Sequence, residues 1–288
     1  ALLFSKEKKA VPKDSLVYLM LLYIAWMGLT TIFAFEPKAA GEQYIKVLKI
    51  MLPIFLTMMM FNSKERIHQL LWIIAISIGF FAIKGGVFTI STAGAFRVYG
   101  PPGTFIEENN ALAIASLMVI PLMIYLRTQL TKSWQRKVML LCIFSMVISV
   151  LGSQSRGAFL AISTVGCYYW LQSKNKILLG MVLIVFIVSV ATFMPESWFE
   201  RMNTINSFEE DGSAMGRIYA WKVALNVANH NILGGGFNLW SKSTYIEYLE
   251  SFNPVTQTAF VAHSIYFSVL AEHGWIGLFL FLIQFYLG

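Results

Sequence analysis

The sequence has little charge and almost no cysteine. Only 13% of its 288 residues are charged, against about a quarter in a soluble globular domain. In contrast, 57% are hydrophobic and the mean hydropathy is +0.64. Water is therefore not the main solvent of this chain. The two cysteines, Cys142 and Cys167, fall inside apolar runs, so neither a disulfide framework nor a metal cluster built on cysteine is expected.

Several enzyme motifs are also missing. The chain has no P-loop, dinucleotide fingerprint, nucleophile elbow or zinc signature, so ATP-driven chemistry and metallohydrolysis have no support. The net charge is +7, which a membrane protein acquires from basic residues in its cytoplasmic loops. Because no basic stripe interleaved with aromatic residues lies outside the apolar runs, we expect no nucleic-acid partner.

Apolar runs long enough to cross a bilayer, roughly 16–25 residues each, divide the chain. We predict an all-α fold, a polytopic transmembrane helix bundle surrounded by membrane lipids. The chain starts at Ala1 and stops inside an apolar run, so we expect it to be a fragment of a longer membrane protein. About eight spans are predicted, at 16–35, 44–61, 67–90, 109–127, 137–152, 157–172, 176–194 and 262–287.

Basic residues occur in alternate links between the runs, which assigns those links to the cytoplasm. They include Lys6, Lys8, Lys9, Lys13, Lys64, Arg66, Arg127, Lys132, Arg136, Lys137, Lys174 and Lys176. The chain then divides into three parts. Residues 1–194 hold the N-terminal cytoplasmic stretch and seven spans, residues 195–261 form one long loop on the outer side, and residues 262–288 hold the eighth span.

The long loop contains a predicted helix. Its stretch "DGSAMGRIYAWKVALNVANHNILGGGF" offers Ser213 as an N-cap and three glycines, 234–236, as the break after the helix. Apolar residues recur at helical spacing, which predicts an amphipathic helix lying on the membrane surface or against the bundle. These residues are Ile218, Trp221, Ala224, Leu225 and Ala228.

Three cationic or titratable residues fall on the outer side. Arg156 lies in the polar turn 153–156 between the fifth and sixth spans, Arg217 opens the loop helix, and His263 enters the eighth span. Each has an ordinary interpretation, because arginine at a helix end can snorkel to headgroups and a lone histidine is often only a satisfied polar residue. The turn at Arg156, however, presents hydroxyls, backbone N–H groups and a guanidinium together, which suits an anion.

Other polar residues interrupt or flank the spans. Lys84 interrupts the third span, and Glu272 with His273 interrupts the eighth. Glu272 follows His263 by nine residues, roughly 13 Å along a helix and on nearly the opposite face. A dyad of His263 and Glu272 is therefore not expected unless the helix breaks.

The link "FRVYGPPGTFIEENNALA" precedes the fourth span. Glu108 and Asn109 at the start of that span can cap the helix and complement its dipole, or they can bind an acceptor or a metal. Arg97 can supply a further phosphate contact.

Taken in order, five segments resemble the O-antigen ligase superfamily, which includes lipopolysaccharide O-antigen ligases, O-antigen polymerases and protein O-oligosaccharyltransferases. The closest likeness is to exosortase-associated O-glycosylation ligases. The resemblance covers residues 96 to 285. Its segments are "YGPPGTFIEENNALA", "LGSQSRGAFLA", "SAMGRIYAWKVA", "GGGF" and "AHSIYFSVLAEHGWIGL".

The resemblance implies transfer of a glycan from undecaprenyl diphosphate to a lipid or protein hydroxyl, at the periplasmic face of a bacterial inner membrane, without metal or cofactor. Arg156 and Arg217 would hold the diphosphate, with Ser153 and Ser155 beside them, and His263 would assist the acceptor or the leaving group. Arg97, Glu108, Asn109 and Glu272 would support the acceptor or the site.

Two alternatives stay open at this point. The first is a polymerase that joins lipid-linked repeat units, because it needs the same diphosphate clamp and base. The second is a transporter of small anions, with the arginines as selectivity residues. The clustering of the arginines on one side, and the lack of paired broken helices, disfavour the transporter.

Overall fold

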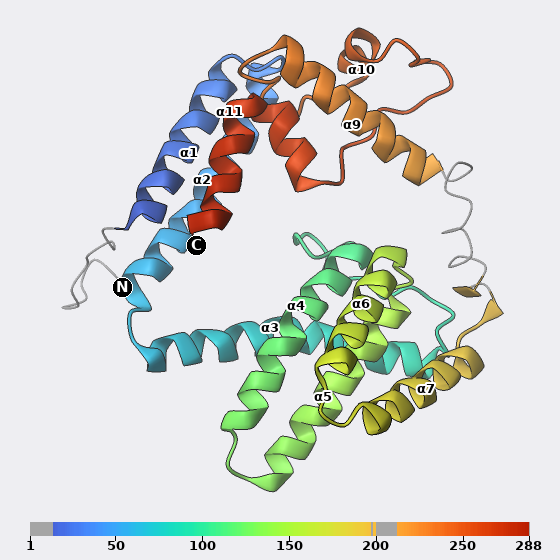
Figure 1. Ribbon diagram of the computed structural model, residues 1–288. Helices are drawn as coiled ribbons and strands as arrows, with labels where there is room; N and C mark the ends of the chain where they lie inside the picture. Colours follow the sequence, from blue (N-terminus) through green and yellow to red (C-terminus); the bar gives the residue numbers. More distant parts are fainter. Residues whose placement is uncertain (1–13, 197, 200–211, 288) are drawn as a thin grey trace. The chain divides into compact units, whose positions relative to one another are not determined.

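The computed structural model describes residues 14–196, 198–199 and 212–287, and this part of the chain contains helices and no strand (Figure 1). The predicted all-α fold is confirmed. The chain forms two compact units. One consists of the described residues of Ala1–Asn62 and Phe208–Gly288, and the other of those of Ser63–Ser207. We call them unit 1 and unit 2.

Unit 1 joins the two ends of the described chain. Its helices are α1 (Ser15–Ile32), α2 (Pro37–Met60), α9 (Gly212–His230), α10 (Lys242–Tyr248) and α11 (Ile265–Leu287). Helix α1 packs on α2 and α11, and α9 packs on α10 and α11. Asp14 caps α1 by accepting a hydrogen bond from the Leu16 amide at 2.8 Å. The cap predicted at Ser213 lies outside the described side chains.

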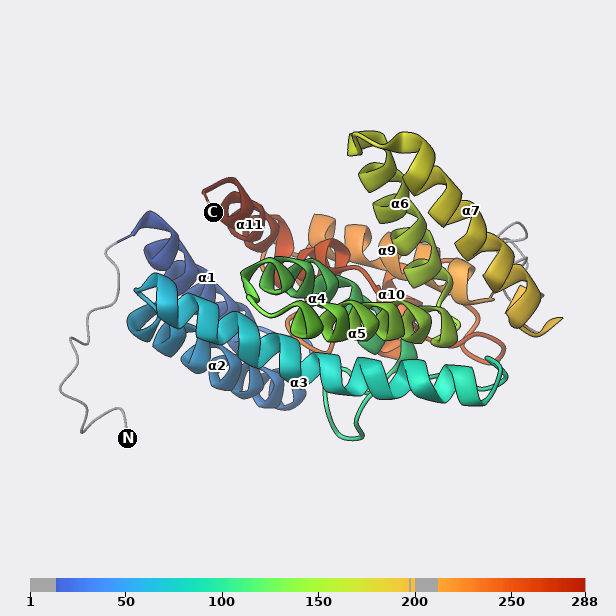
Figure 2. The ribbon, with the colours of Figure 1, turned by 90° about the horizontal axis from the view of Figure 1, so that it is seen from below.

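Unit 2 consists of consecutive helices joined by short turns, apart from the longer link before α4. They are α3 (Lys64–Ser91), α4 (Asn109–Gln129), α5 (Ser133–Gly152), α6 (Arg156–Gln172) and α7 (Lys176–Phe193). Helices α3, α4 and α5 pack on one another, and α6 contacts α4, α5 and α7. The run of these helices is seen from a second direction in Figure 2.

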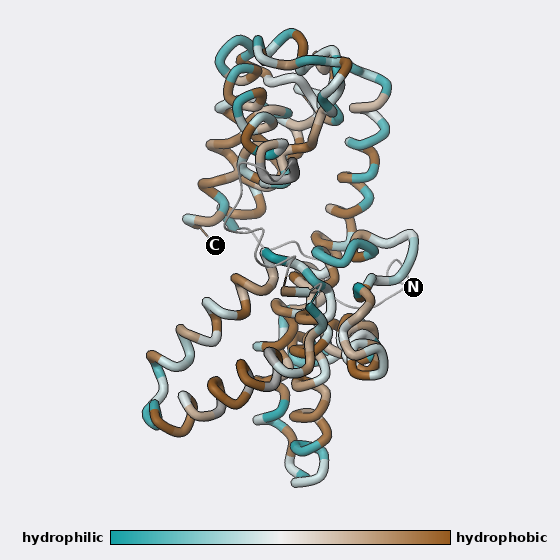
Figure 3. Tube along the Cα trace, turned by 90° about the vertical axis from the view of Figure 1, so that its right-hand side faces the viewer, coloured by the Kyte–Doolittle hydropathy of each residue, from teal (hydrophilic) through white to brown (hydrophobic). Residues whose placement is uncertain are grey.

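Six of the described helices, α1 to α5 and α11, are long and apolar enough to cross a membrane. The sequence predicted about eight such spans. The sixth predicted run forms α6, whose 17 residues extend about 26 Å, less than a hydrocarbon core of about 30 Å. Large apolar side chains remain exposed on the spanning helices, as at Ile76 (64%), Leu141 (67%) and Phe279 (62%). Apolar residues dominate the helices and polar ones gather at the turns (Figure 3), the pattern that lipid contact favours.

Small residues bring α3 and α5 close together. Thr89 Oγ1 bonds back to the Gly85 carbonyl at 2.9 Å, and the Ser145 hydroxyl donates to the Ile83 carbonyl at 3.0 Å across the crossing. A Cβ placed on Gly86 would overlap the Ser145 carbonyl oxygen. The glycines after Lys84 therefore serve helix packing, as small residues do between membrane helices, and Lys84 itself is exposed.

Helix α11 is broken at Gly274. This residue has φ 67° and ψ −173°, a conformation that only glycine adopts readily. In Figure 1 the two segments, 265–273 and 275–287, meet at an angle. The eighth predicted span is therefore two helices. Its first segment packs on α9 through Ala271, and its second packs on α1 through Leu280.

Neighbouring segments satisfy the carbonyl groups that the break releases. The Gly235 amide donates to the Ala271 carbonyl at 2.8 Å, and the Gly236 amide donates to the Glu272 carbonyl at 2.9 Å. The Trp26 indole of α1 donates to the His273 carbonyl at 3.0 Å. The three-glycine loop is thus the cap of the broken helix, because unpaired backbone carbonyls are costly in an apolar environment.

His273 ties the break to α1. Its side chain is 1% exposed, and its Nδ1 lies 2.7 Å from the Thr30 hydroxyl. That hydroxyl also lies 3.0 Å from the Met27 carbonyl, so Thr30 joins the imidazole to the backbone of α1. Phe237 packs edge-on against the imidazole, with ring centroids 4.6 Å apart.

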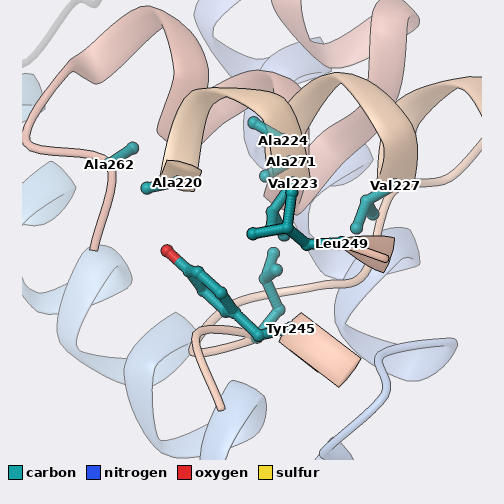
Figure 4. Packing of buried hydrophobic residues seen from close by; sticks show 9 residues of the cluster. Ala220, Val223, Ala224, Val227, Tyr245, Leu249, Ala262 and Ala271 are labelled. Carbon is teal, nitrogen blue, oxygen red and sulfur yellow. The ribbon is translucent and has the colours of Figure 1, made fainter. Parts of the chain in front are cut away.

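Helix α9 buries one face in unit 1. The buried residues follow helical spacing at Ala220, Val223, Ala224 and Val227. They lie over Tyr245, as Figure 4 shows. The predicted face was offset, since Leu225 is 37% exposed. Helix α9 therefore packs against neighbouring helices, α10 and α11, and its predicted place on the membrane surface stays a prediction.

Candidate functional site

The turn between α5 and α6 is built by its own polar side chains. The Ser153 hydroxyl donates to the Val150 carbonyl at 2.6 Å and accepts from the Ser155 amide at 3.2 Å. The Ser155 hydroxyl caps α6 by accepting from the Ala158 amide at 3.2 Å. Both serines are buried. These contacts fix the turn from which Arg156, the first residue of α6, projects.

The link before α4 is held against this turn. The Val98 amide donates to the Gly152 carbonyl at 3.0 Å, and the Asn109 side chain donates to the Ser153 carbonyl at 2.8 Å. Asn109 is therefore a buried support of the turn, at the start of α4.

Gln154 makes two further contacts with the link. Its Nε2 donates to the Gly94 carbonyl at 3.1 Å, and its Oε1 accepts from Arg97 Nε at 3.4 Å. Unit 2 thus brings Arg97 and Asn109 to the turn that carries Arg156.

The acidic residues of the link have different roles. The Glu107 carboxylate accepts from the Gly103 amide at 2.8 Å, and the Gly100 amide donates to the Glu107 carbonyl at 2.8 Å. These bonds close the turn at Pro101 and Pro102. Glu108 is the N-cap residue of α4 by backbone conformation but makes no side-chain capping bond, and its side chain is exposed. Side-chain capping is therefore not the role of Glu108.

Unit 1 carries Arg217 and His263 on segments that touch. Gly216, next to Arg217 on α9, packs against the Phe260 ring. One turn further along α9, the Trp221 indole donates to the Ala262 carbonyl at 2.8 Å. Both contacts join the start of α9 to the segment that leads into His263. Arg217 and His263 are both exposed, so their side chains can reach a ligand.

The backbone of His263 is left-handed, with φ 47°. A non-glycine residue in this region is uncommon and costs about 1 kcal/mol or more. Such strain persists only where neighbouring contacts over-determine the conformation. Here the Ala262 carbonyl is held by Trp221, whose ring also stacks on Phe267 at a centroid distance of 4.9 Å.

Tyr245 also holds the segment that leads into His263. Its hydroxyl donates to the Phe260 carbonyl at 2.7 Å, and its side chain is 1% exposed. Burial raises the pKa of Tyr245 to about 12, so the hydroxyl keeps its proton throughout the neutral range and continues to donate.

We therefore expect Tyr245→Phe to lower the free energy of unfolding by about 1–2 kcal/mol, because the Phe260 carbonyl loses its partner. The midpoint of thermal unfolding of the detergent-solubilised protein measures this effect. Tyr219→Phe is the matched control, because the Tyr219 ring packs against the same cluster and its hydroxyl bonds to no residue within the described ranges. An equal loss in both variants would contradict the role given to the Tyr245 bond.

Glu272 does not join Arg217 and His263. It lies at the far end of the first segment of α11, beside the three-glycine loop. Its carboxyl interacts with the Trp240 side chain and the Asn238 backbone. The break in α11 falls after Glu272, so residues 265–273 stay helical and keep His263 and Glu272 apart, as the nine-residue spacing predicted.

The three principal candidates fall on different units. Arg156 belongs to unit 2, whereas Arg217 and His263 belong to unit 1. Within residues 14–196, 198–199 and 212–287 there is no group of three or more His, Cys, Asp or Glu side chains that could hold a metal ion. Each unit therefore carries its own candidates, which are the Arg156 guanidinium in unit 2 and the Arg217 guanidinium with the His263 imidazole in unit 1.

Sequence reasoning missed several residues that shape the site. Gln154 was predicted only as part of the polar turn 153–156. Its position between two serines was a signal that side-chain hydrogen bonds hold this turn. Trp221 was predicted only as one of the apolar residues at helical spacing, and Tyr245 was given no role. Their partners are backbone carbonyls 41 and 15 residues away, which no local pattern reveals.

Two known protein families match the chain, and one of the matches covers the three principal candidates. A family model described as O-Antigen ligase matches residues 138–282, which include Arg156, Arg217 and His263. A second model, described as a family of unknown function, matches residues 1–131. No curated protein matches the chain, and no solved structure does.

The first match covers half of the chain and begins within α5, so it includes the polar turn, α9 and most of α11. It confirms the resemblance to the O-antigen ligase superfamily for the four segments that lie within residues 138–282, whereas the first segment, at 99–113, falls in the region of the second model. Together with the six apolar helices, it shows a multi-pass membrane protein that belongs to the O-antigen ligase family.

Proposed function

We propose that this protein transfers a glycan from undecaprenyl diphosphate to a hydroxyl group of a lipid or a protein, at the periplasmic face of a bacterial inner membrane. The observation that carries the proposal is that Arg156, Arg217 and His263 all lie in the region matched by the O-antigen ligase family. The proposed orientation rests on the sequence pattern, in which the basic links are predicted to be cytoplasmic.

Arg156 is the proposed anchor of the donor in unit 2. It stands at the first position of α6, where backbone N–H groups and the helix dipole favour an anion. Its guanidinium can bind two phosphate oxygens at once. Ser153 and Ser155 remain predicted donor contacts. Their hydroxyls already have partners within the turn, so we assign them chiefly to shaping it.

Arg217 and His263 are the proposed reacting groups of unit 1. In the transfer, the acceptor oxygen forms a bond to the anomeric carbon, and the bond from that carbon to the diphosphate breaks. The electron pair leaves with the diphosphate, whose added charge Arg217 stabilises. His263 takes the proton of the acceptor hydroxyl. Chemistry of this kind requires no metal.

The supporting residues have separate proposed roles. Arg97 and Asn109 lie at the turn of Arg156, whereas the exposed Glu108 can face an acceptor. Glu272 stays a predicted support of the site that acts through the fold of α11. The division of the chain at residues 194 and 261 into spans and a periplasmic loop likewise stays a prediction.

A polymerase is the main alternative. It differs from a ligase in its acceptor, which would be a second lipid-linked glycan. We favour the ligase because of the resemblance to exosortase-associated O-glycosylation ligases, a closer likeness that stays a prediction. A transporter of small anions would move its substrate without forming a bond.

One reconstitution tests the proposal. The full-length protein in lipid discs receives undecaprenyl-diphosphate glycan, with a lipid acceptor, a protein acceptor or a second donor molecule as co-substrate. We expect transfer by the wild type. In Arg156→Ala, Arg217→Ala and His263→Ala we expect transfer rates lower by roughly 100-fold to 1,000-fold, the usual cost of removing one group that stabilises a transition state.

The matched controls are Lys222→Ala on the exposed surface of α9 and His230→Ala at its end. Both should retain the wild-type rate. Full activity of Arg217→Ala would show that the diphosphate clamp is wrong. Product formed only with the second donor molecule would identify a polymerase, and anion flux without product would identify a transporter.

A further inference from the structure

We infer that Gln154 is a positioning residue that holds Arg97 beside Arg156, so that unit 2 presents two guanidiniums to one diphosphate. This inference rests on the proposed function and deepens it, because it assigns a further donor-binding cation to unit 2, in addition to Arg156 there and Arg217 in unit 1. The sequence offered Arg97 only as a possible contact on a link and gave Gln154 no role.

The contacts of Gln154 determine how its amide is oriented. Nε2 can only donate, and it faces the Gly94 carbonyl at 3.1 Å. Oε1 can only accept, and it faces Arg97 Nε at 3.4 Å. The side chain is 7% exposed, and its backbone is left-handed with φ 53°. A buried side chain on a strained backbone therefore makes two hydrogen bonds to the link.

The link is fastened on both sides of these contacts. The Val98 amide, next to Arg97, donates to the Gly152 carbonyl at 3.0 Å. Asn109, where the link ends, donates to the Ser153 carbonyl at 2.8 Å. The backbone of Arg97 is thus fixed relative to the turn, and Gln154 fixes the direction of its guanidinium.

The exposed side of Arg97 suits an oxyanion. Gln154 engages Nε, and the side chain is exposed, which leaves the two Nη groups for phosphate oxygens. The Glu107 carboxylate, ten residues further along the link, accepts from the Gly103 amide, which holds it within the proline turn. A diphosphate has two phosphoryl groups, and two arginine forks can each engage one of them. A second guanidinium on the same unit therefore favours diphosphate over monophosphate.

Binding of undecaprenyl diphosphate, with undecaprenyl phosphate as the comparison, tests this assignment in the full chain in lipid discs. Gln154→Met keeps the length of the side chain and removes the hydrogen bonds to Arg97 and to the Gly94 carbonyl. Arg97→Met removes the cation. We expect each variant to bind the diphosphate roughly 10-fold more weakly, as for loss of a bond to a charged group, with a smaller change for the monophosphate. The double variant should be no weaker than Arg97→Met alone, because Gln154 acts through Arg97.

The control is Gln172→Met, at the opposite end of α6 and exposed, which should bind as the wild type does. Arg97→Lys keeps the charge and should recover part of the affinity. In transfer, Gln154→Met should raise the KM for the donor much more than it lowers kcat, which a general loss of structure would not do.

Wild-type affinity in Gln154→Met would overturn the inference. If Gln154→Met loses native protein on heating, the affinity of Arg97→Met is the deciding measurement, because that variant changes only an exposed side chain. Unchanged affinity in Arg97→Met would also overturn the inference. Equal binding of monophosphate and diphosphate by the wild type would do the same. Failure of the proposed function is distinct, since it appears as no glycan transfer by a wild type that still binds the diphosphate.

Discussion

Replacing Gly274 with alanine is expected to prevent unit 1 from folding around α11. A Cβ at this position would overlap the Ile232 carbonyl oxygen, which belongs to backbone and cannot rotate away. The φ of 67° and ψ of −173° are also costly for any residue with a side chain. We expect the free energy of unfolding to fall by at least about 4 kcal/mol, the range of the most damaging core substitutions.

The fraction of native protein that survives heating, measured by size-exclusion chromatography, reports this loss. Gly41→Ala is the matched control in unit 1, because a Cβ there meets nothing within 4 Å. It should leave stability unchanged or raise it by up to about 1 kcal/mol through helix propensity. Gly274→Ala protein as stable as the control would show that the interlock with the three-glycine loop is not required.

A second large loss is expected for Gly86→Ala in unit 2. The added Cβ would overlap the Ser145 carbonyl oxygen and lie against the Ser145 side chain, so α3 and α5 would have to separate. Separation would break the hydrogen bond from the Ser145 hydroxyl to the Ile83 carbonyl. It would also open the core around Met146, which is fully buried in this unit. We expect a loss of about 3–4 kcal/mol, as for overpacking that forces the backbone to move.

The same heating assay measures this loss, with Gly157→Ala on α6 as the control, because a Cβ at Gly157 lies in open space. A Gly86→Ala protein that survives heating as well as Gly157→Ala would mean that α3 and α5 do not need their close approach. Enzymatic activity is a poor substitute for this measurement, because the α5–α6 turn would move with α5 and confuse stability with function.

The sequence by itself determined the helices closely. The run predicted at 67–90 forms Lys64–Ser91, and that at 109–127 forms Asn109–Gln129. These boundaries are local, because apolar length, capping residues and turns specify them. The sequence also indicated the family, because the motifs that identify it are short runs of adjacent residues. The predicted face of α9 was partly wrong, because the packing of α10 and α11 decides which side is buried, and the spacing of residues within α9 does not contain that information.

Only the tertiary structure decided how the polar residues are used. The sequence showed a glycine in α11 and three glycines after α9. In the structure these two segments are joined, because the Gly235 and Gly236 amides donate to carbonyls of α11 beside the break. The sequence likewise predicted Arg156 as a donor-binding residue and placed Arg97 on the link before the fourth span. In the structure, two hydrogen bonds of Gln154 attach that link to the turn of Arg156. Composition and periodicity specify which segments become helices in a membrane. The pairing of a side chain with a remote backbone carbonyl depends on distances that exist only after the helices pack.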